Sequence, residues 1–204
     1  MPKWCSLALS GSITVFALCN FFEARTIITS LILGAAAFCL SGDLVLSHTI
    51  PGGMPLGMLL FATAHAIFIT SYVKHIKSLN CRVFTKSFFI VISINYMYMF
   101  TLWFFFMRGS GSSITIIGSL IYGLVVSSMT AFTIPLFQAD KRNLLTMIGA
   151  YSFLTCDSIC GIKVAVDFRG DDLIIWGAYI FGLYLIVYSM GKTPITNRVS
   201  KLPL

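Results

Sequence analysis

Charged residues are scarce in this sequence. Lysine, arginine, aspartate and glutamate together make up only 10% of the 204 residues, whereas 57% of the residues are hydrophobic. A water-soluble domain of this length carries about a quarter charged residues, because its surface has to face water. The composition therefore excludes a soluble globular domain and indicates an integral membrane protein.

The sequence also lacks the patterns of nucleic-acid-binding and metal-binding proteins. The net charge is +7, but the basic residues sit in short gaps between apolar runs and form no stripe with interleaved aromatic residues. Such gaps are typical of loops that face anionic lipid headgroups. The six cysteines form no CxxC pair and show no Cys/His metal spacing, so we interpret them as small packing residues. We expect no nucleic-acid partner, no metal and no cofactor.

Apolar runs long enough to cross a membrane fill most of the chain. A helical span needs about 20 mostly apolar residues to cross hydrocarbon about 30 Å thick. Short loops with turn residues separate the runs, such as "TIPGGMP" at 49–55 and "RGSGSS" at 108–113. The pattern predicts an all-α polytopic bundle of about seven spans that forms a single membrane domain over residues 1–204. The predicted spans are 5–22, 27–46, 54–73, 85–107, 113–136, 143–165 and 173–190.

Loop charges predict how the bundle is oriented, because loops rich in Lys and Arg stay in the cytosol. Of the 14 basic residues, four fall on one side: Lys3, Arg108, Lys163 and Arg169. The rest fall on the other side: Arg25, Lys74, Lys77, Arg82, Lys86, Lys141, Arg142, Lys192, Arg198 and Lys201. We therefore expect a cytosolic C-terminus. The host membrane would be the endoplasmic reticulum or plasma membrane in a eukaryote, or the inner membrane in a bacterium.

Two acidic residues, Asp43 and Asp157, lie inside apolar runs. A carboxylate there costs several kcal/mol unless it is protonated or paired, and no Lys or Arg lies deep in any predicted span. If the two acids face one another, one can donate a proton while the other accepts one, as in two-carboxyl hydrolases. Alternatively, they join helices by hydrogen bonds or form a proton relay. The other acids fall in loops or at span ends: Glu23, Asp140, Asp167, Asp171 and Asp172.

The sequence around the two acids does not establish whether they lie close together. By the loop charges, both lie in the half of the membrane away from the cytosol. We expect them to converge only if span 27–46 packs against span 143–165, which the sequence does not establish. On the helix face of Asp157 we expect one wall of a groove for a lipid tail. That wall would consist of small and apolar residues: Ala150, Phe153, Cys160 and Gly161.

His65 is the only histidine in the middle of a predicted span. A lone histidine in such a place is more often a hydrogen-bonded core residue than a metal ligand. A zinc hydrolase would need three ligands, for instance His65 with both aspartates, and the spacing gives no positive support for such a set.

Three stretches carry a recognisable set of motifs. "FCLSGDLVL" followed by "GMLLFATAHAIFITSY" has a Gly-Asp pair and then Gly, Phe and His at four-residue steps, and "IGAYSFLTCDSICG" has a second acidic motif. Together they resemble the signature of the YhhN family, the membrane lysoplasmalogenases. The residues that match are Gly42, Asp43, Gly57, Phe61, His65, Gly149, Ala150, Phe153 and Asp157, with weaker matches at Tyr122, Met129 and Tyr179.

The sequence departs from the family pattern at three points. The family usually shows eight spans, and the span expected to be missing here is the first. Cys156 stands where a serine is usual, and Leu183 stands where a polar residue is frequent. The two acids are unchanged.

The resemblance implies hydrolysis of the sn-1 vinyl ether of a lysoplasmalogen to a fatty aldehyde and a glycerophospho-ethanolamine or -choline, without a cofactor. The substrate would be a lysophospholipid, and membrane lipids would surround the protein. Asp43 and Asp157 would form the acid/base pair, with their individual roles unassigned. Residues expected to position substrate or water are His65, Gly42, Phe61, Tyr122 and Phe153.

Two alternatives remain open at this point. The first is a non-enzymatic membrane transporter or lipid-binding protein that uses the intramembrane acids as a proton relay. The second keeps hydrolysis but changes the substrate to another lysolipid or an amide-linked lipid, with a metal at His65. Dependence on a pH gradient would favour the first alternative, and loss of activity on chelation would favour the second.

Overall fold

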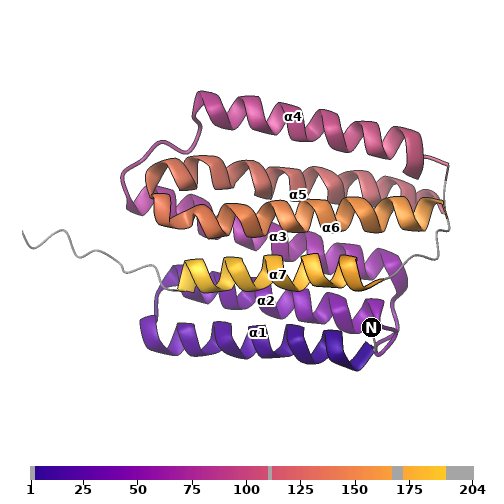
Figure 1. Cartoon of the computed structure of the whole chain (residues 1–204), viewed down its shortest axis with the longest axis horizontal. Helices are drawn as coiled ribbons and strands as arrows, with labels where there is room; N and C mark the ends of the chain where they lie inside the picture. The colour runs from indigo at the N-terminus through magenta and orange to yellow at the C-terminus, as the bar shows by residue number, and fades with distance from the viewer. Residues whose placement is uncertain (1–2, 110–111, 167–171, 192–204) are drawn as a thin grey trace, which may run out of the picture.

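In a computed structural model of the chain, the described residues form seven long helices that lie side by side and alternate in direction (Figure 1). The structure describes residues 3–109, 112–166 and 172–191. Arg169, Lys192, Arg198, Lys201, Asp167 and Asp171, whose loop positions enter the charge predictions, lie outside the described residues. The helices are α1 (Lys3–Ala24), α2 (Ile27–Leu46), α3 (Gly53–Ser78), α4 (Lys86–Leu102), α5 (Ser113–Ala139), α6 (Leu144–Ala165) and α7 (Asp172–Gly191).

All seven helices are long and apolar enough to cross a membrane, and the described residues contain no strand. The predicted helical membrane bundle is therefore confirmed, and the chain is a multi-pass membrane protein. The predicted ends hold to within a few residues, except that α3 continues to Ser78 instead of ending near residue 73. Lys77 lies in this last turn, where a basic side chain interacts favourably with the free carbonyls of the helix.

Local sequence explains where several helices begin. Thr26, Thr85 and Ser112 precede α2, α4 and α5, and each hydroxyl accepts a hydrogen bond from the backbone N–H three residues later. These bonds satisfy donors that the first turn of a helix leaves free. After Leu102, α4 continues as a π turn over Trp103–Met107, which the run of aromatic residues did not predict.

The helices pack in an order that encloses α3 and leaves α4 at the edge. α3 packs between α2 and α5, α6 packs on α7, and α1 covers α2 and α7. α4 lies at one edge of the bundle, opposite α1, and packs mainly on α5 (Figure 1). Most of its large apolar side chains point away from the bundle, among them Ile90, Ile94 and Met97, as expected of a helix that faces lipid.

Glycines set the closest helix contacts near the site. A Cβ on Gly42 of α2 would lie only 2.6 Å from a ring carbon of Phe61 of α3. A Cβ on Gly149 of α6 or on Gly182 of α7 would lie 2.7 Å from the carbonyl oxygen of the other glycine. Small residues at such points let helix backbones approach closely in a membrane, and here they bring the acid-bearing helices up to α3 and α7.

Candidate active site

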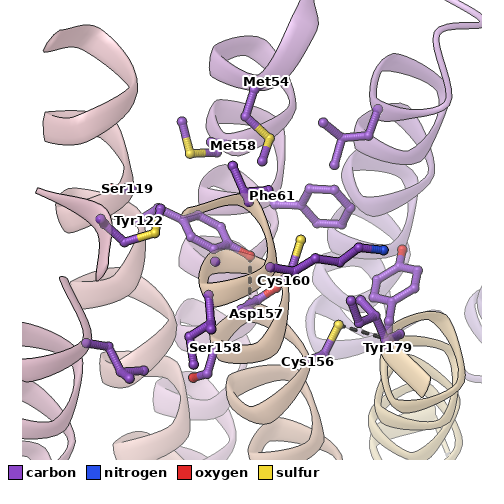
Figure 2. Close-up of a pocket in the computed structure, with 18 of the residues that line it drawn as sticks. Met54, Met58, Phe61, Ser119, Tyr122, Cys156, Asp157, Ser158, Cys160 and Tyr179 are labelled. Atoms are coloured by element: carbon purple, nitrogen blue, oxygen red, sulfur yellow. Dashed lines mark hydrogen bonds between the residues drawn. The ribbon is translucent and has the colours of Figure 1, made fainter. Parts of the chain in front are cut away.

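A pocket of about 850 Å³ opens at one end of the bundle. At this end of the bundle, α2 and α6 finish and α3, α5 and α7 begin. Both intramembrane acids, Asp43 and Asp157, line the pocket. The surrounding wall is mostly apolar, with methionines and aromatic side chains from α3, α4, the π turn and α7 (Figure 2).

Asp157 is bound to a tyrosine from a neighbouring helix. The Tyr122 hydroxyl of α5 donates a 2.7 Å hydrogen bond to Asp157 Oδ2, as Figure 2 shows. His65 Nε2 of α3 lies 3.2 Å from the same hydroxyl and 3.9 Å from Asp157 Oδ2. The Asp157 side chain remains 18% exposed, while His65 is fully buried. Asp157 is therefore the more accessible of the two acids to a substrate or water in the pocket.

Asp43 has a separate tyrosine and a more enclosed position. The Tyr179 hydroxyl of α7 donates a 2.7 Å hydrogen bond to Asp43 Oδ2. Asp43 is only 1% exposed, and its Oδ1 is buried without a hydrogen-bond partner. An ionised carboxylate with one unsolvated oxygen is costly, so this surrounding suits a carboxyl that carries a proton.

Phe153 lies between the two carboxyl–tyrosine pairs. Its ring packs edge-on against His65, with 5.2 Å between centroids, and against Tyr179, with 5.4 Å between centroids. The Phe61 ring also packs edge-on against Tyr179, with 5.7 Å between centroids. The two phenylalanines thus hold His65 and Tyr179 in place, and Gly42 leaves the space that Phe61 occupies.

The acids reach one pocket without direct packing of their helices. No Cα atom of α2 comes within 8 Å of one of α6, so the packing that we expected to be required does not occur. Instead α7 packs against both helices, and α3 packs against α2. Within the part of the chain that the structure describes, no hydrogen bond joins Asp43 to Asp157. Two separate carboxyls therefore face a common space.

The sulfur and nitrogen groups at the site do not form a metal cluster. Among the described residues, no three His, Cys, Asp or Glu side chains are grouped closely enough to hold a metal ion. Cys156, in the position of the usual serine, donates its thiol to the Ile175 carbonyl of α7 at 3.2 Å. This contact ties α6 to α7 next to the site, so the cysteine has a packing role.

The structure brings the predicted site residues together in two layers. Asp43, Asp157, Phe61 and Tyr122 line the pocket, and His65, Phe153 and Gly42 support them from behind. Of the predicted groove wall on α6, Cys160 and Gly161 line the pocket.

The lining residues that were not predicted site residues include Tyr179, which had only a weak motif match, and Lys163. For Tyr179 the available signal was the weak motif match alone, because the same predicted span carries two further tyrosines, Tyr184 and Tyr188. Lys163 follows Asp157 by six residues, a spacing that places the two on different faces of a helix, so no sequence signal indicated that Lys163 belongs to the site.

Comparison with known proteins identifies the family. Neither the curated proteins nor the solved structures include a match to this chain. A model of the YhhN family matches residues 6–190, a range that contains both carboxyl–tyrosine pairs and reaches all seven helices. Because the match covers most of the chain, the protein belongs to the YhhN family.

Proposed function

We propose that this protein hydrolyses the sn-1 vinyl ether of lysoplasmalogens, releasing a fatty aldehyde and a glycerophospho-ethanolamine or -choline. The observation that carries the proposal is the pair of carboxyls, Asp43 and Asp157, that share one apolar pocket while each is held by its own tyrosine. Membership of a family that includes lysoplasmalogenases agrees with it. A pocket of about 850 Å³ with apolar walls also suits an alkenyl chain.

The chemistry of a vinyl ether requires one proton donor and one acceptor. Protonation of the β-carbon of the double bond gives an oxocarbenium ion. Water then adds to the cationic carbon and loses a proton, and the resulting hemiacetal collapses to the aldehyde and the free glycerol hydroxyl. A protonated carboxyl can supply the first proton, and a carboxylate can stabilise the cation and take a proton from water.

The surroundings of the acids favour a division of roles. Asp43, enclosed and with one unpartnered oxygen, is the better proton donor to the β-carbon. Asp157 is open to the pocket and lies beside Tyr122 and His65, so it is better placed to activate water. Fully buried His65 would act by orienting the Tyr122 hydroxyl and, through it, the Asp157 carboxyl.

Removal of the tyrosine hydroxyls tests whether the two pairs act together. We expect Tyr122→Phe and Tyr179→Phe each to lower kcat for a lysoplasmenyl lipid by about 10- to 100-fold, because each carboxyl loses the tyrosine hydroxyl that holds it in position. Tyr98→Phe, on the exposed side of α4, is the matched control and should leave kcat unchanged. Wild-type kcat in both pocket variants would show that the hydroxyls do not take part in catalysis.

The direct test is fatty aldehyde release by the purified protein. We expect aldehyde from 1-alkenyl-lysophosphatidylethanolamine in detergent micelles, where no pH gradient exists, and the same rate in the presence of EDTA. Loss of the activity on chelation would favour the metal-dependent alternative. Absence of aldehyde from a monodisperse protein would contradict the proposal.

The proton-relay alternative also has an observation in its favour. Several polar side chains on α3 and α6 are buried without hydrogen-bond partners between the pocket and the opposite end of the bundle: Ser71, Tyr72, His75 and Thr146. Such groups usually bind unseen water, and a water chain there could conduct protons. Proton uptake by sealed vesicles under an imposed pH gradient, without aldehyde release, would favour this function over hydrolysis.

A further inference from the structure

A cationic side chain lies in the wall of the pocket near its end. Lys163, in the last turn of α6, is half-buried and lines the same pocket as Asp157. Among the described residues that line this pocket, Lys163 is the only lysine or arginine. The exposed His48, just after α2, lines the pocket as well. The pocket is thus lined by the two carboxyls, where the proposed reaction takes place, and by the positive charge of Lys163 near the end of α6.

Building on the proposed function, we propose that Lys163 binds the phosphodiester of the lysophospholipid headgroup and so makes the enzyme select phospholipids over neutral alkenyl glycerols. An ammonium group on a flexible stem is a common partner for a phosphate oxygen. The substrate would then lie with its phosphate at Lys163, its vinyl ether at the acids and its alkenyl chain along the apolar wall.

The dimensions of the substrate fit this placement. Lys163 follows Asp157 by six residues, which is an axial rise of about 9 Å along α6. A lysine side chain reaches about 6 Å from its Cα, and the ether oxygen and the phosphorus of the substrate are separated by five bonds, about 6 Å when extended. Lys163 can therefore meet the phosphate while the vinyl ether lies at Asp157.

Other groups at this end of the bundle are less well placed to bind the phosphate. His65 is fully buried against Tyr122 and Phe153, so a phosphate could not reach its ring without displacing them. Arg108 follows the π turn, but its guanidinium lies over the Phe104 ring at 4.6 Å and does not line the pocket. Arg108 therefore serves as a charge control near the same end.

The test compares two substrates that differ only in the phosphate headgroup. Wild type, Lys163→Gln, Lys163→Arg and Arg108→Gln would be assayed on 1-alkenyl-lysophosphatidylethanolamine and on 1-alkenylglycerol, in maltoside micelles free of other phosphate. We expect Lys163→Gln to raise the apparent KM for the phospholipid about tenfold with kcat nearly unchanged, because a charge-assisted contact is lost from ground and transition state alike. On alkenylglycerol, Lys163→Gln should behave as wild type. Lys163→Arg should recover most of the affinity, and Arg108→Gln should have no effect on either substrate.

The two substrates separate failure of this assignment from failure of the proposed function. Equal effects of Lys163→Gln on both substrates, or no effect on either, would overturn the headgroup assignment while leaving vinyl-ether hydrolysis intact. An effect of Arg108→Gln equal to that of Lys163→Gln would also overturn it, since it would point to general attraction of anionic lipid. A wild-type protein that cleaves neither substrate would refute the hydrolase itself and this assignment with it.

Discussion

Replacing either intramembrane acid with its amide is expected to lower the turnover of a lysoplasmenyl lipid by about 10³-fold, within the range of general acid–base catalysis. Asp157→Asn removes the group that would activate water, and Asp43→Asn removes the proton that would reach the β-carbon. Neither amide can replace these functions at neutral pH, because an amide neither donates a proton to carbon nor accepts one from water. The measurement is single-turnover aldehyde release by purified protein in detergent.

The amide variants are suitable because they preserve shape and hydrogen bonding. The Tyr122 and Tyr179 hydroxyls can still donate to the amide oxygens in place of the carboxyl oxygens, so we expect unchanged thermal midpoints. Glu23→Gln, at the exposed end of α1, is the matched acid-to-amide control and should retain wild-type turnover. A folded Asp43→Asn or Asp157→Asn variant with most of the wild-type rate would refute the acid/base pair.

The fold could be predicted closely from the sequence because the bilayer imposes strong local constraints. Each span needs a long apolar run, and loops such as 108–113 carry the turn residues and polar groups that apolar runs lack. The π turn over Trp103–Met107 was missed, since its aromatic residues are equally compatible with a continuous α-helix. Three residues of this turn line the pocket: Trp103, Phe106 and Met107.

The site could be predicted only in part, because its contacts join distant positions. Asp43 and Asp157 stand out in the sequence, since charge in an apolar run is costly wherever the helix packs. The partner of Asp43 is Tyr179, 136 residues away, and only the packing of α7 between α2 and α6 brings them together. Lys163 was not among the predicted site residues for the same reason. The spacing between Asp157 and Lys163 relates positions on α6 alone, whereas side chains from several helices line the pocket.

The contact between α6 and α7 leads to the prediction with the largest effect on stability. In Gly182→Ala the new methyl would lie 2.7 Å from the backbone oxygen of Gly149 and 3.2 Å from a ring carbon of Phe153. Neither the backbone nor the enclosed ring can move easily, so the helices must separate. We expect a loss of about 1–3 kcal/mol in unfolding free energy, typical of overpacking, measured by SDS titration of folded protein in mixed micelles.

Gly177→Ala on the same helix separates overpacking from a general effect of replacing glycine. A Cβ at Gly177 would meet no atom within 4 Å, and alanine favours helix by up to about 1 kcal/mol, so this variant should be as stable as wild type or more so. Because Phe153 supports both His65 and Tyr179, Gly182→Ala should also reduce turnover in the fraction that remains folded, and Gly177→Ala should not. Equal stability of the two variants would mean that α6 and α7 do not approach as closely as Gly149 and Gly182 allow. The positions of Phe153 and Tyr179, and with them that of Asp43, would then have to be fixed by other contacts.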